Sequence, residues 1–211
     1  MPKSRTSSRS SVRAGLQHPP GSAGGPPGQV RIIAGSLRGS RIAVPDRPGL
    51  RPTSDRVRET LFNWLQPILP GSRVLDLFAG VGALGFEAMS RGAAAVTLVE
   101  RDRQTAQALD DTARRLGVDR LRVIQADALT WLDTASEDRF DLVFLDPPFA
   151  DGLLPRTIAA LPKHLAETAM VYVESPAEMA TGHTLAVPAD WRLWREGRTR
   201  QVRYALYRVG D

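Results

Sequence analysis

Short apolar runs alternate with segments of helical periodicity through most of the chain. The apolar runs predict strands at Arg73–Phe78, Ala95–Glu100, Leu121–Gln125, Phe140–Leu145 and Ala169–Glu174. Residues at helical spacing predict helices at Gly82–Arg91, Arg103–Leu116, Ala128–Thr134 and Leu154–Leu165. Strands of this length that alternate with helices are typical of a parallel sheet covered on both faces. The pattern therefore predicts an α/β fold with a doubly wound sheet.

The segment before this alternation predicts a hairpin and a helix. Val30–Ala34 and Arg41–Val44 are short β-type runs on either side of a glycine-containing turn. A loop then leads to the N-cap signal Thr53-Ser54-Asp55, and apolar residues at helical spacing extend the helix to about Gln66. At the other end of the chain, Trp191–Glu196 and Val202–Val209 predict an antiparallel hairpin at the sheet edge, about Gly197-Arg198.

The chain is expected to have three parts. Residues 1–28 combine Ser, Gly and Pro with four basic residues and no acid, which predicts a disordered basic tail. An Arg- and Ser-rich start also resembles an organellar transit peptide, but the periodic apolar residues of an amphipathic helix are missing. Residues 29–66 hold the hairpin and helix, and residues 67–211 hold the alternating sheet.

Composition excludes several kinds of chemistry. The 211 residues contain no cysteine, which excludes disulfides, zinc-thiolate sites, iron–sulfur clusters and a cysteine nucleophile. The three histidines show no metal-ligand spacing, so no metal is expected. No apolar run approaches the ~20 residues of a membrane span, which predicts a soluble, cytoplasmic protein.

The distribution of charge says more than the net charge of +5. Residues 1–70 carry eleven basic against three acidic residues, residues 71–190 eleven against eighteen, and residues 191–211 six against two. Of the 28 basic residues, 26 are arginine, which donates bidentately to phosphate and stacks on bases. A basic surface formed by the two ends beside an acidic body therefore indicates an anionic polymer as partner.

A glycine-rich turn follows the first predicted strand of the sheet. Gly80, Gly82 and Gly85 match G-x-G-x-x-G, and Glu100 follows Gly80 by twenty residues at the end of the next strand. Taken alone, this glycine spacing with a following acid indicates a dinucleotide-binding oxidoreductase. Asp76 changes the interpretation because a carboxylate inside the turn repels a pyrophosphate and suits a ligand that carries an ammonium group.

A third acid, Asp127, ends the third strand and is placed to reach an adenine amino group. With Asp76 and Glu100 it puts acids at three successive strand ends. Such a set suits a cationic nucleoside better than a dianionic one. S-Adenosylmethionine, with a sulfonium, an amino group and a ribose, is the expected cofactor.

The fourth strand ends in Asp146-Pro147-Pro148-Phe149. Two successive prolines fix φ and remove two N–H donors, so the turn is expected to be rigid. It would present the Asp146 carboxylate and a carbonyl as acceptors for a planar amine, whose ring would stack on Phe149. The amine lone pair would then point toward an electrophilic methyl group.

These motifs resemble those of methyltransferases that act on exocyclic amines. Upstream residues narrow the likeness: Arg31–Gly35, Leu50–Thr53 and Asp55–Leu65 are similar to bacterial small-subunit (16S) ribosomal RNA guanine-N2 methyltransferases of the RsmD type. The resemblance covers about residues 29–209. It implies a Rossmann-like S-adenosylmethionine-dependent methyltransferase sheet of seven strands with an N-terminal β-hairpin and, as a partner, ribosomal RNA or the small ribosomal subunit.

The resemblance also implies roles for individual residues. The methionine part of the cofactor is expected to contact Asp76, Phe78, Ala79, Gly80 and Gly82, the ribose Glu100, and the adenine Asp127 and Ala128. Arg101 is expected as a further cofactor contact. The residues expected to bind the target guanine are Asp146, Pro147, Pro148 and Phe149. RNA contacts are expected from residues 29–66, through Arg31, Arg38, Arg41, Arg51, Thr53, Arg56 and Arg58.

The expected reaction is direct methyl transfer to guanine N2 by a monomer, with positioning supplying most of the catalysis. An adenine-N6 methyltransferase acting on RNA or DNA would use the same cofactor and turn, and the nucleoside product separates the two. A protein-amide methyltransferase also shares the turn but does not need basic flanks. A pure RNA-binding module would not need an acidic pocket.

Overall fold

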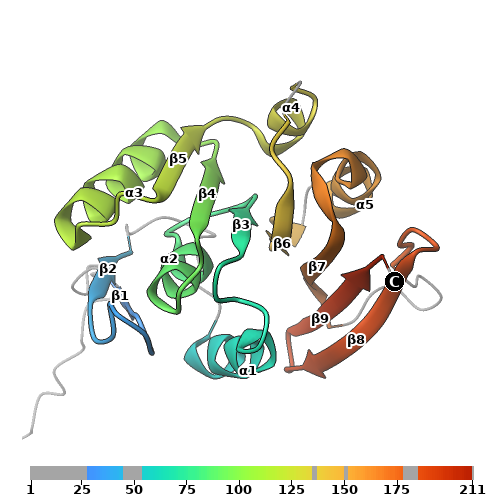
Figure 1. Cartoon of the computed structure of the whole chain (residues 1–211), viewed down its shortest axis with the longest axis horizontal. Coiled ribbons are helices and arrows are strands. Elements are labelled where there is room, and N and C mark those ends of the chain that lie inside the picture. Colours follow the sequence, from blue (N-terminus) through green and yellow to red (C-terminus); the bar gives the residue numbers. More distant parts are fainter. Residues whose placement is uncertain (1–27, 45–53, 135–136, 150–151, 178–184, 211) are drawn as a thin grey trace, which may run out of the picture.

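The computed structural model describes residues 28–44, 54–134, 137–149, 152–177 and 185–210. Its main sheet has seven strands: β3 (Arg73–Asp76), β4 (Ala95–Glu100), β5 (Leu121–Gln125), β6 (Phe140–Leu145), β7 (Leu165–Pro176), β8 (Trp191–Arg198) and β9 (Val202–Val209). They lie in the order β5-β4-β3-β6-β7-β9-β8 (Figure 1). Strands β3 to β7 are parallel, and β9 and β8 are added antiparallel at one edge. The expected α/β sheet with a C-terminal hairpin is confirmed.

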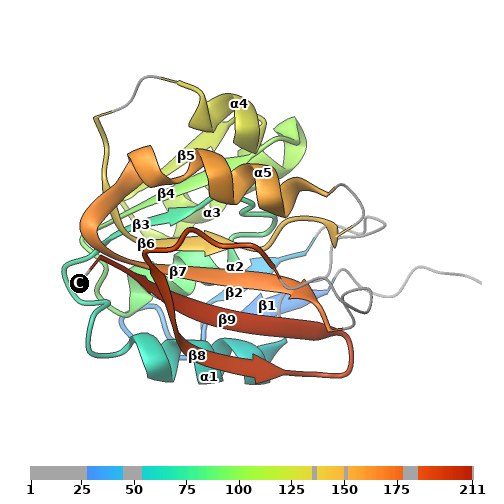
Figure 2. The same cartoon turned by 90° about the vertical axis from the view of Figure 1, so that its right-hand side faces the viewer.

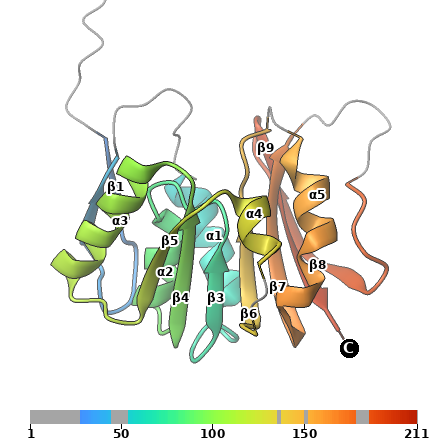
Figure 3. The same cartoon turned by 90° about the horizontal axis from the view of Figure 1, so that it is seen from above.

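Helices cover both faces of the sheet (Figure 3). The helices are α1 (Asp55–Leu65), α2 (Ala83–Ser90), α3 (Arg103–Leu116), α4 (Ala128–Leu132) and α5 (Leu153–Ala160). One hydrophobic core joins the sheet to α1, α2 and α3, and a second joins its other face to α4 and α5. Because both faces are covered, the central strands are almost entirely buried, which explains their continuous apolar sequences.

Local signals in the sequence set the helix ends. Ser54 accepts the N–H of Val57 and caps α1, and Asp102 accepts the N–H of Thr105 and caps α3. Gly117 ends α3 in the left-handed conformation with φ of 65°. The 14-residue α3 is therefore closed at both ends by residues suited to those positions.

The N-terminal hairpin, with β1 (Gln29–Arg31) and β2 (Arg41–Ala43), is also confirmed and forms a separate two-stranded sheet. Its turn rests on α2, where the Ser36 N–H donates to the Ser90 carbonyl over 2.8 Å. Gly35 needs its small size there, because it has φ of 83° and an added Cβ would lie 1.8 Å from the Ser90 carbonyl oxygen.

Several predicted boundaries are wrong, and the first strand of the sheet, expected at Arg73–Phe78, ends at Asp76. The helix expected at Leu154–Leu165 ends at Ala160 and is followed by a 3-10 turn at Pro162–His164, because proline cannot continue the helical ladder. Strand β7 consequently begins at Leu165 rather than Ala169. The last hairpin turns after Arg198, not about Gly197-Arg198, because β8 continues through both residues. The tail of residues 1–27 and the loop of residues 45–53 lie outside the described residues.

The strand order places a change of direction between β3 and β6. From β3 the chain winds outward through β4 and β5, and it then returns to β6 on the other side of β3. In open α/β sheets, ligands bind at the carboxyl ends of the strands at such a switch point. The segments after β3 and β6 are those in which the sequence predicted the chemistry.

Candidate functional site

Four acidic residues stand at the carboxyl ends of four neighbouring strands. Asp76 and Glu100 are the last residues of β3 and β4, Asp127 follows β5, and Asp146 follows β6. In the spatial order β5-β4-β3-β6 these residues form one row along the carboxyl edge of the sheet. A row of acids beside a glycine-rich loop suits a cationic ligand, as the sequence predicted.

The glycine-rich loop is held by Glu100. One oxygen of its carboxylate accepts the Gly80 N–H at 2.9 Å, and the other accepts the Asp102 N–H at 2.8 Å. Gly80 and Gly82 have φ of 51° and 77°, values that residues with a Cβ rarely adopt. At the start of this loop, Phe78 is half-buried and Ala79 is buried. The loop therefore exposes backbone rather than side chains to the carboxyl edge.

Asp76 lies beneath the loop and is only 2% exposed. Its carboxylate accepts the N–H of Gly85 at 3.1 Å. Burial raises the pKa of Asp76 to about 7, the Gly85 hydrogen bond opposes that rise, and the charge of Glu100 adds to it. Near neutral pH this carboxyl is therefore poised between its neutral and its charged form.

The residues expected to hold adenine are placed by helix α4. Asp127 is exposed, and its side chain caps the helix by accepting the N–H groups of Leu129 and Thr130, each at 3.0 Å. Ala128 is buried behind it. Arg101 is exposed, and its carbonyl accepts from the Gln125 side chain at 3.2 Å. Asp127 thus has a structural role besides the one expected from sequence.

The Asp146 turn lies across the switch point from Asp76. Asp146 is half-buried, Pro147 is buried, and Pro148 and Phe149 are exposed. Phe149 is 44% exposed and is one of three large apolar residues exposed in the described part of the chain. An exposed aromatic ring three residues after a partly buried carboxylate is compatible with a flat ring bearing an amine, and the roles of Asp146 and Phe149 stay predictions.

A buried pair on the neighbouring strand was not among the predicted site residues. On β7, the Tyr172 hydroxyl donates to the Glu174 carboxylate at 2.7 Å, and both side chains are buried. Burial raises the pKa of Tyr172 well above its usual value, and the charges of Glu174 and Asp146 add to this. Tyr172 therefore stays a neutral donor close to Asp146. The signal in the sequence was an acid directly after the apolar run of residues 169–173.

The residues expected to contact RNA fall into three groups: exposed residues, residues outside the described part of the chain, and one buried residue. Arg31, Arg38, Arg41 and Arg56 are exposed. Arg51 and Thr53 lie outside the described residues. Arg58 is completely buried, so the expectation that it contacts phosphate is wrong.

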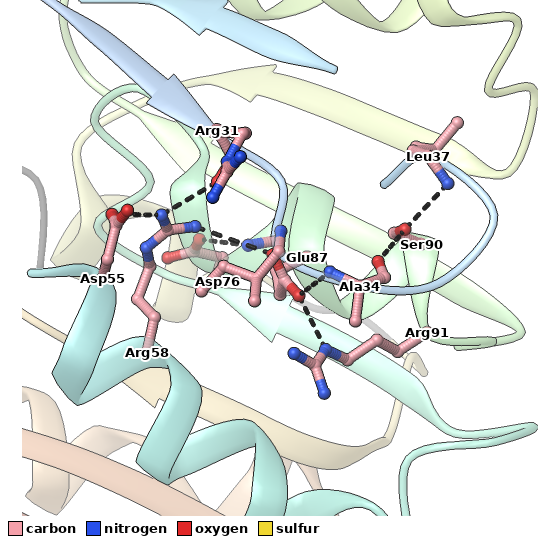
Figure 4. Close-up of polar contacts among 11 residues, drawn as sticks. Arg31, Ala34, Leu37, Asp55, Arg58, Asp76, Glu87, Ser90 and Arg91 are labelled. Carbon is pink, nitrogen blue, oxygen red and sulfur yellow. Dashed lines mark hydrogen bonds and ion pairs between the residues drawn. The ribbon is translucent and has the colours of Figure 1, made fainter. Parts of the chain in front are cut away.

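Arg58 instead joins the helix α1 to the N-terminal hairpin (Figure 4). Its Nη2 donates to the Asp55 carboxylate at 2.7 Å and to the Arg31 carbonyl at 2.9 Å. Its Nη1 lies 3.6 Å from a carboxylate oxygen of Glu87 on α2. A charged group without exposure needs such partners, because its desolvation is otherwise uncompensated.

Glu87 is the centre of this contact and was also missed by sequence reasoning. Its buried carboxylate accepts the N–H groups of Ile33 and Ala34 at 2.7 and 3.1 Å and the Arg91 Nε–H at 2.6 Å. The hairpin is therefore fixed to α2, whose first residues belong to the glycine-rich loop (Figure 4). An acid in the middle of an otherwise apolar α2 was the available signal.

Within the described ranges, none of the helices combines the length and apolar character needed to cross a membrane. The same residues include no group of three acidic or histidine side chains that could hold a metal ion.

Comparisons with known proteins agree with this geometry. A family model described as conserved hypothetical protein 95 matches residues 30–208. Ribosomal RNA small subunit methyltransferase D of Escherichia coli strain K12 is 48% identical over 182 residues, which are 85% of this chain and 90% of that protein. The protein of the same name from Haemophilus influenzae is 43% identical over 185 residues, which are 85% of this chain and 94% of its own.

Solved structures show the same likeness. The structure of yhhF from Escherichia coli, described as a candidate methyltransferase, has a TM-score of 0.78 and 46% sequence identity to this chain. The match covers 87% of this chain and 99% of the yhhF chain. A more distant structure, that of the SMU.776 protein in complex with SAH, has a TM-score of 0.56 and 16% sequence identity. The match covers 73% of this chain and 48% of the SMU.776 chain. That second likeness concerns the fold alone.

Proposed function

Because the chain belongs to the family described as conserved hypothetical protein 95 and is 48% identical to a ribosomal RNA small subunit methyltransferase D, we propose that it methylates the exocyclic N2 amine of a guanine in small-subunit ribosomal RNA. The observation that carries the proposal is the position of the Asp146 turn. It directly follows β6, two residues beyond Phe144, which is the register partner of Asp76 on β3 across the switch point of the sheet. A cofactor above β3 and a base held by the turn would therefore be neighbours.

The residues at the loop fit S-adenosylmethionine. Asp76 and Glu100 supply carboxylates for an ammonium group and for ribose hydroxyls, and each Glu100 oxygen retains a second lone pair after accepting a backbone N–H. Glycines at positions 80 and 82 keep the loop backbone open to close approach. When bound, the cofactor supplies an electrophilic methyl group.

The chain's own contribution is then to orient the amine. The Asp146 carboxylate and a carbonyl of the turn accept its two N–H groups, and Phe149 offers a stacking surface that is worth about 1–3 kcal/mol per base. The turn holds these acceptors rigidly because Pro147 and Pro148 fix the backbone. The negative charge of Asp146 also offsets the positive charge that develops on the nitrogen as the new N–C bond forms.

The test is transfer of labelled methyl from S-adenosylmethionine to small-subunit ribosomal RNA, free or in particles that lack the modification, followed by digestion to nucleosides. We expect label in N2-methylguanosine. Label in N6-methyladenosine would retain the pocket but refute guanine as the target. Label that resists RNase and stays with protein would identify an amide methyltransferase instead.

Asp76 predicts a pH dependence of cofactor binding. With its pKa near 7, the fraction of ionised Asp76 rises about tenfold between pH 6 and pH 8, so we expect the Kd for S-adenosylmethionine to fall roughly tenfold over that range. Calorimetric titration at several pH values measures it. Asp76→Asn should bind more weakly and lose this dependence, and any titration that remains belongs to the cofactor. Equal Kd values at pH 6 and pH 8 would contradict the role of Asp76.

The stability of the cofactor-free protein should fall as the pH rises, whereas its affinity for the cofactor should increase. A carboxyl whose pKa is raised on folding contributes stability that is complete below its unfolded pKa of 3.8 and is lost as the pH rises through about 7. Unfolding of the cofactor-free protein across that range therefore separates the folding effect of Asp76 from its binding effect.

A further inference from the structure

A second carboxylate stands next to Asp146 in the sheet. Strands β6 and β7 pair in parallel up to Leu145 and Val173, so Asp146 and Glu174 are the next residues along the two neighbouring segments. Neighbouring strands lie about 4.8 Å apart. Glu174 is 4% exposed, which is close to the 2% of Asp76. The backbone therefore places two carboxyl groups side by side at the edge of the sheet where the base would enter.

Both side chains belong to the same face of the sheet. Two positions earlier, Phe144 and Tyr172 are register partners, and both pack in the core that contains α1. Side chains alternate between the faces of a strand, so Asp146 and Glu174 continue this row. The Tyr172 hydroxyl gives independent evidence that they are close. Besides burial, which has the largest effect, the charges of Glu174 and Asp146 both raise the pKa of Tyr172.

The Glu174 carboxylate is held from two strands. The Tyr172 hydroxyl donates to it at 2.7 Å. Figure 2 shows β7 between β6 and β9, and on β9 the register partner of Glu174 is Tyr204. The Tyr204 ring stacks on that of Trp64 from α1, with 5.7 Å between the ring centres. The orientation of Glu174 is thus set by the protein before a base binds.

Stability alone does not account for an acid at this position. Taking a carboxylate out of water is costly, and the neighbouring Val171 and Val173 on the same strand avoid that cost. Asp146 and Glu174 also interact with other groups of the chain. A carboxylate offers about four acceptor positions, so an entering base can share an oxygen with such a group or displace it.

Two adjacent carboxylates match one edge of guanine. Guanine carries protons both on its N2 amine and on N1, the ring nitrogen beside that amine, so these neighbouring atoms are donors. In adenine and cytosine, the ring nitrogen beside the Watson–Crick edge of the amine bears a lone pair and is an acceptor. Ionised carboxylates only accept hydrogen bonds. The pair of acids therefore suits guanine and repels the other two bases.

We propose that Glu174, held by Tyr172, accepts the N1–H of the target guanine while Asp146 orients the N2 amine, and that this second contact selects guanine over adenine. The proposal rests on the proposed function, since it takes the base to enter at the Asp146 turn. Glu174 takes no part in methyl transfer itself. Its contribution is to recognise the ring nitrogen next to the reacting amine.

The test compares guanine with 2-aminopurine at the target position of the same RNA. 2-Aminopurine keeps the amine, but its N1 bears a lone pair, so we expect the original protein to methylate it with a kcat/KM about 100-fold lower or less. In Glu174→Gln, the side-chain amide can donate to that lone pair. Its kcat/KM should fall for guanine and rise for 2-aminopurine, which shifts the ratio about tenfold or more. The intrinsic reactivity of the two bases cancels when the variants are compared.

Two variants serve as controls. Tyr172→Phe leaves Glu174 as an acceptor, so turnover of guanine should fall without any gain for 2-aminopurine. Glu167→Gln, at an exposed position of the same strand, should change neither. Equal losses for both bases in Glu174→Gln would reduce Glu174 to a structural residue and overturn the proposal. Failure of the original protein to form N2-methylguanosine is a different result and would refute the proposed function.

If Glu174→Gln does not fold, the original protein can be tested with 1-methylguanine at the target position. The N1 methyl group replaces the proton offered to Glu174, so turnover should fall about 100-fold or more. Normal turnover of this RNA would overturn the proposal.

Discussion

Replacement of Asp146 by alanine is expected to lower kcat for methyl transfer about 100-fold or more, while the Kd for S-adenosylmethionine changes less than about threefold. The magnitude is that of removing one preorganised polar group aimed at developing charge. Cofactor affinity is spared because the acids assigned to the cofactor, Asp76 and Glu100, stand on β3 and β4. Single-turnover methylation and calorimetric titration of the cofactor measure the two quantities separately.

Asp146→Asn is the matched variant. Its amide oxygen still accepts one N–H of the target amine, but the negative charge is lost, so kcat should fall between the values of the original protein and Asp146→Ala. Two results would contradict the orienting role: normal turnover in Asp146→Ala, or loss of cofactor binding equal to the loss of turnover. The second would place Asp146 in the cofactor site.

Replacement of Glu87 by glutamine is expected to cost about 3 kcal/mol of unfolding free energy, because it takes a carboxylate from the buried guanidinium of Arg58. The exposed Asp55 remains beside Arg58 and keeps the loss at the lower end of the range for buried pairs. For a domain of this size the melting temperature should fall roughly 10 °C. Amide exchange at Ile33 and Ala34, which donate to Glu87, should rise more than elsewhere.

Glu167→Gln serves as the control, since Glu167 is exposed on β7 and its replacement should leave the melting temperature unchanged. A double-mutant cycle with Arg58→Met tests the ion pair itself. If the pair matters, the double variant should lose less stability than the sum of the two single losses. Additive losses, or a cost below about 1 kcal/mol for Glu87→Gln, would show that Glu87 and Arg58 act independently.

Much of this architecture could be predicted because its signals are local. The strand ends at Glu100 and Leu145 were predicted to the residue, since apolar runs stop there and turn residues follow. The glycine spacing and the two prolines also act within a few residues, so the positions of Asp76 and Asp146 at neighbouring strand ends follow from the sheet order alone.

What was missed depends on partners far along the chain. The helical spacing of α1 puts Arg58, and not Arg56, on the face of the buried apolar residues. What satisfies the buried charge of Arg58 is Glu87, which is 29 residues later and on another helix. The start of β7 at Leu165 depends in the same way on pairing with Phe140 across the sheet. Pro162 is a local signal for the end of α5, but the apolar spacing through Leu165 favours a longer helix.

The position of β9 between β7 and β8 sets an order of events during synthesis on the ribosome. Strand β8 leaves the ribosome first, but its place in the sheet exists only once β9 has paired with β7. At 5–20 residues per second, the chain between the end of β7 and the start of β9 takes about 1–5 s to make. Over that interval the long apolar edge of β7 stays open, and neighbouring nascent chains or chaperones compete for it.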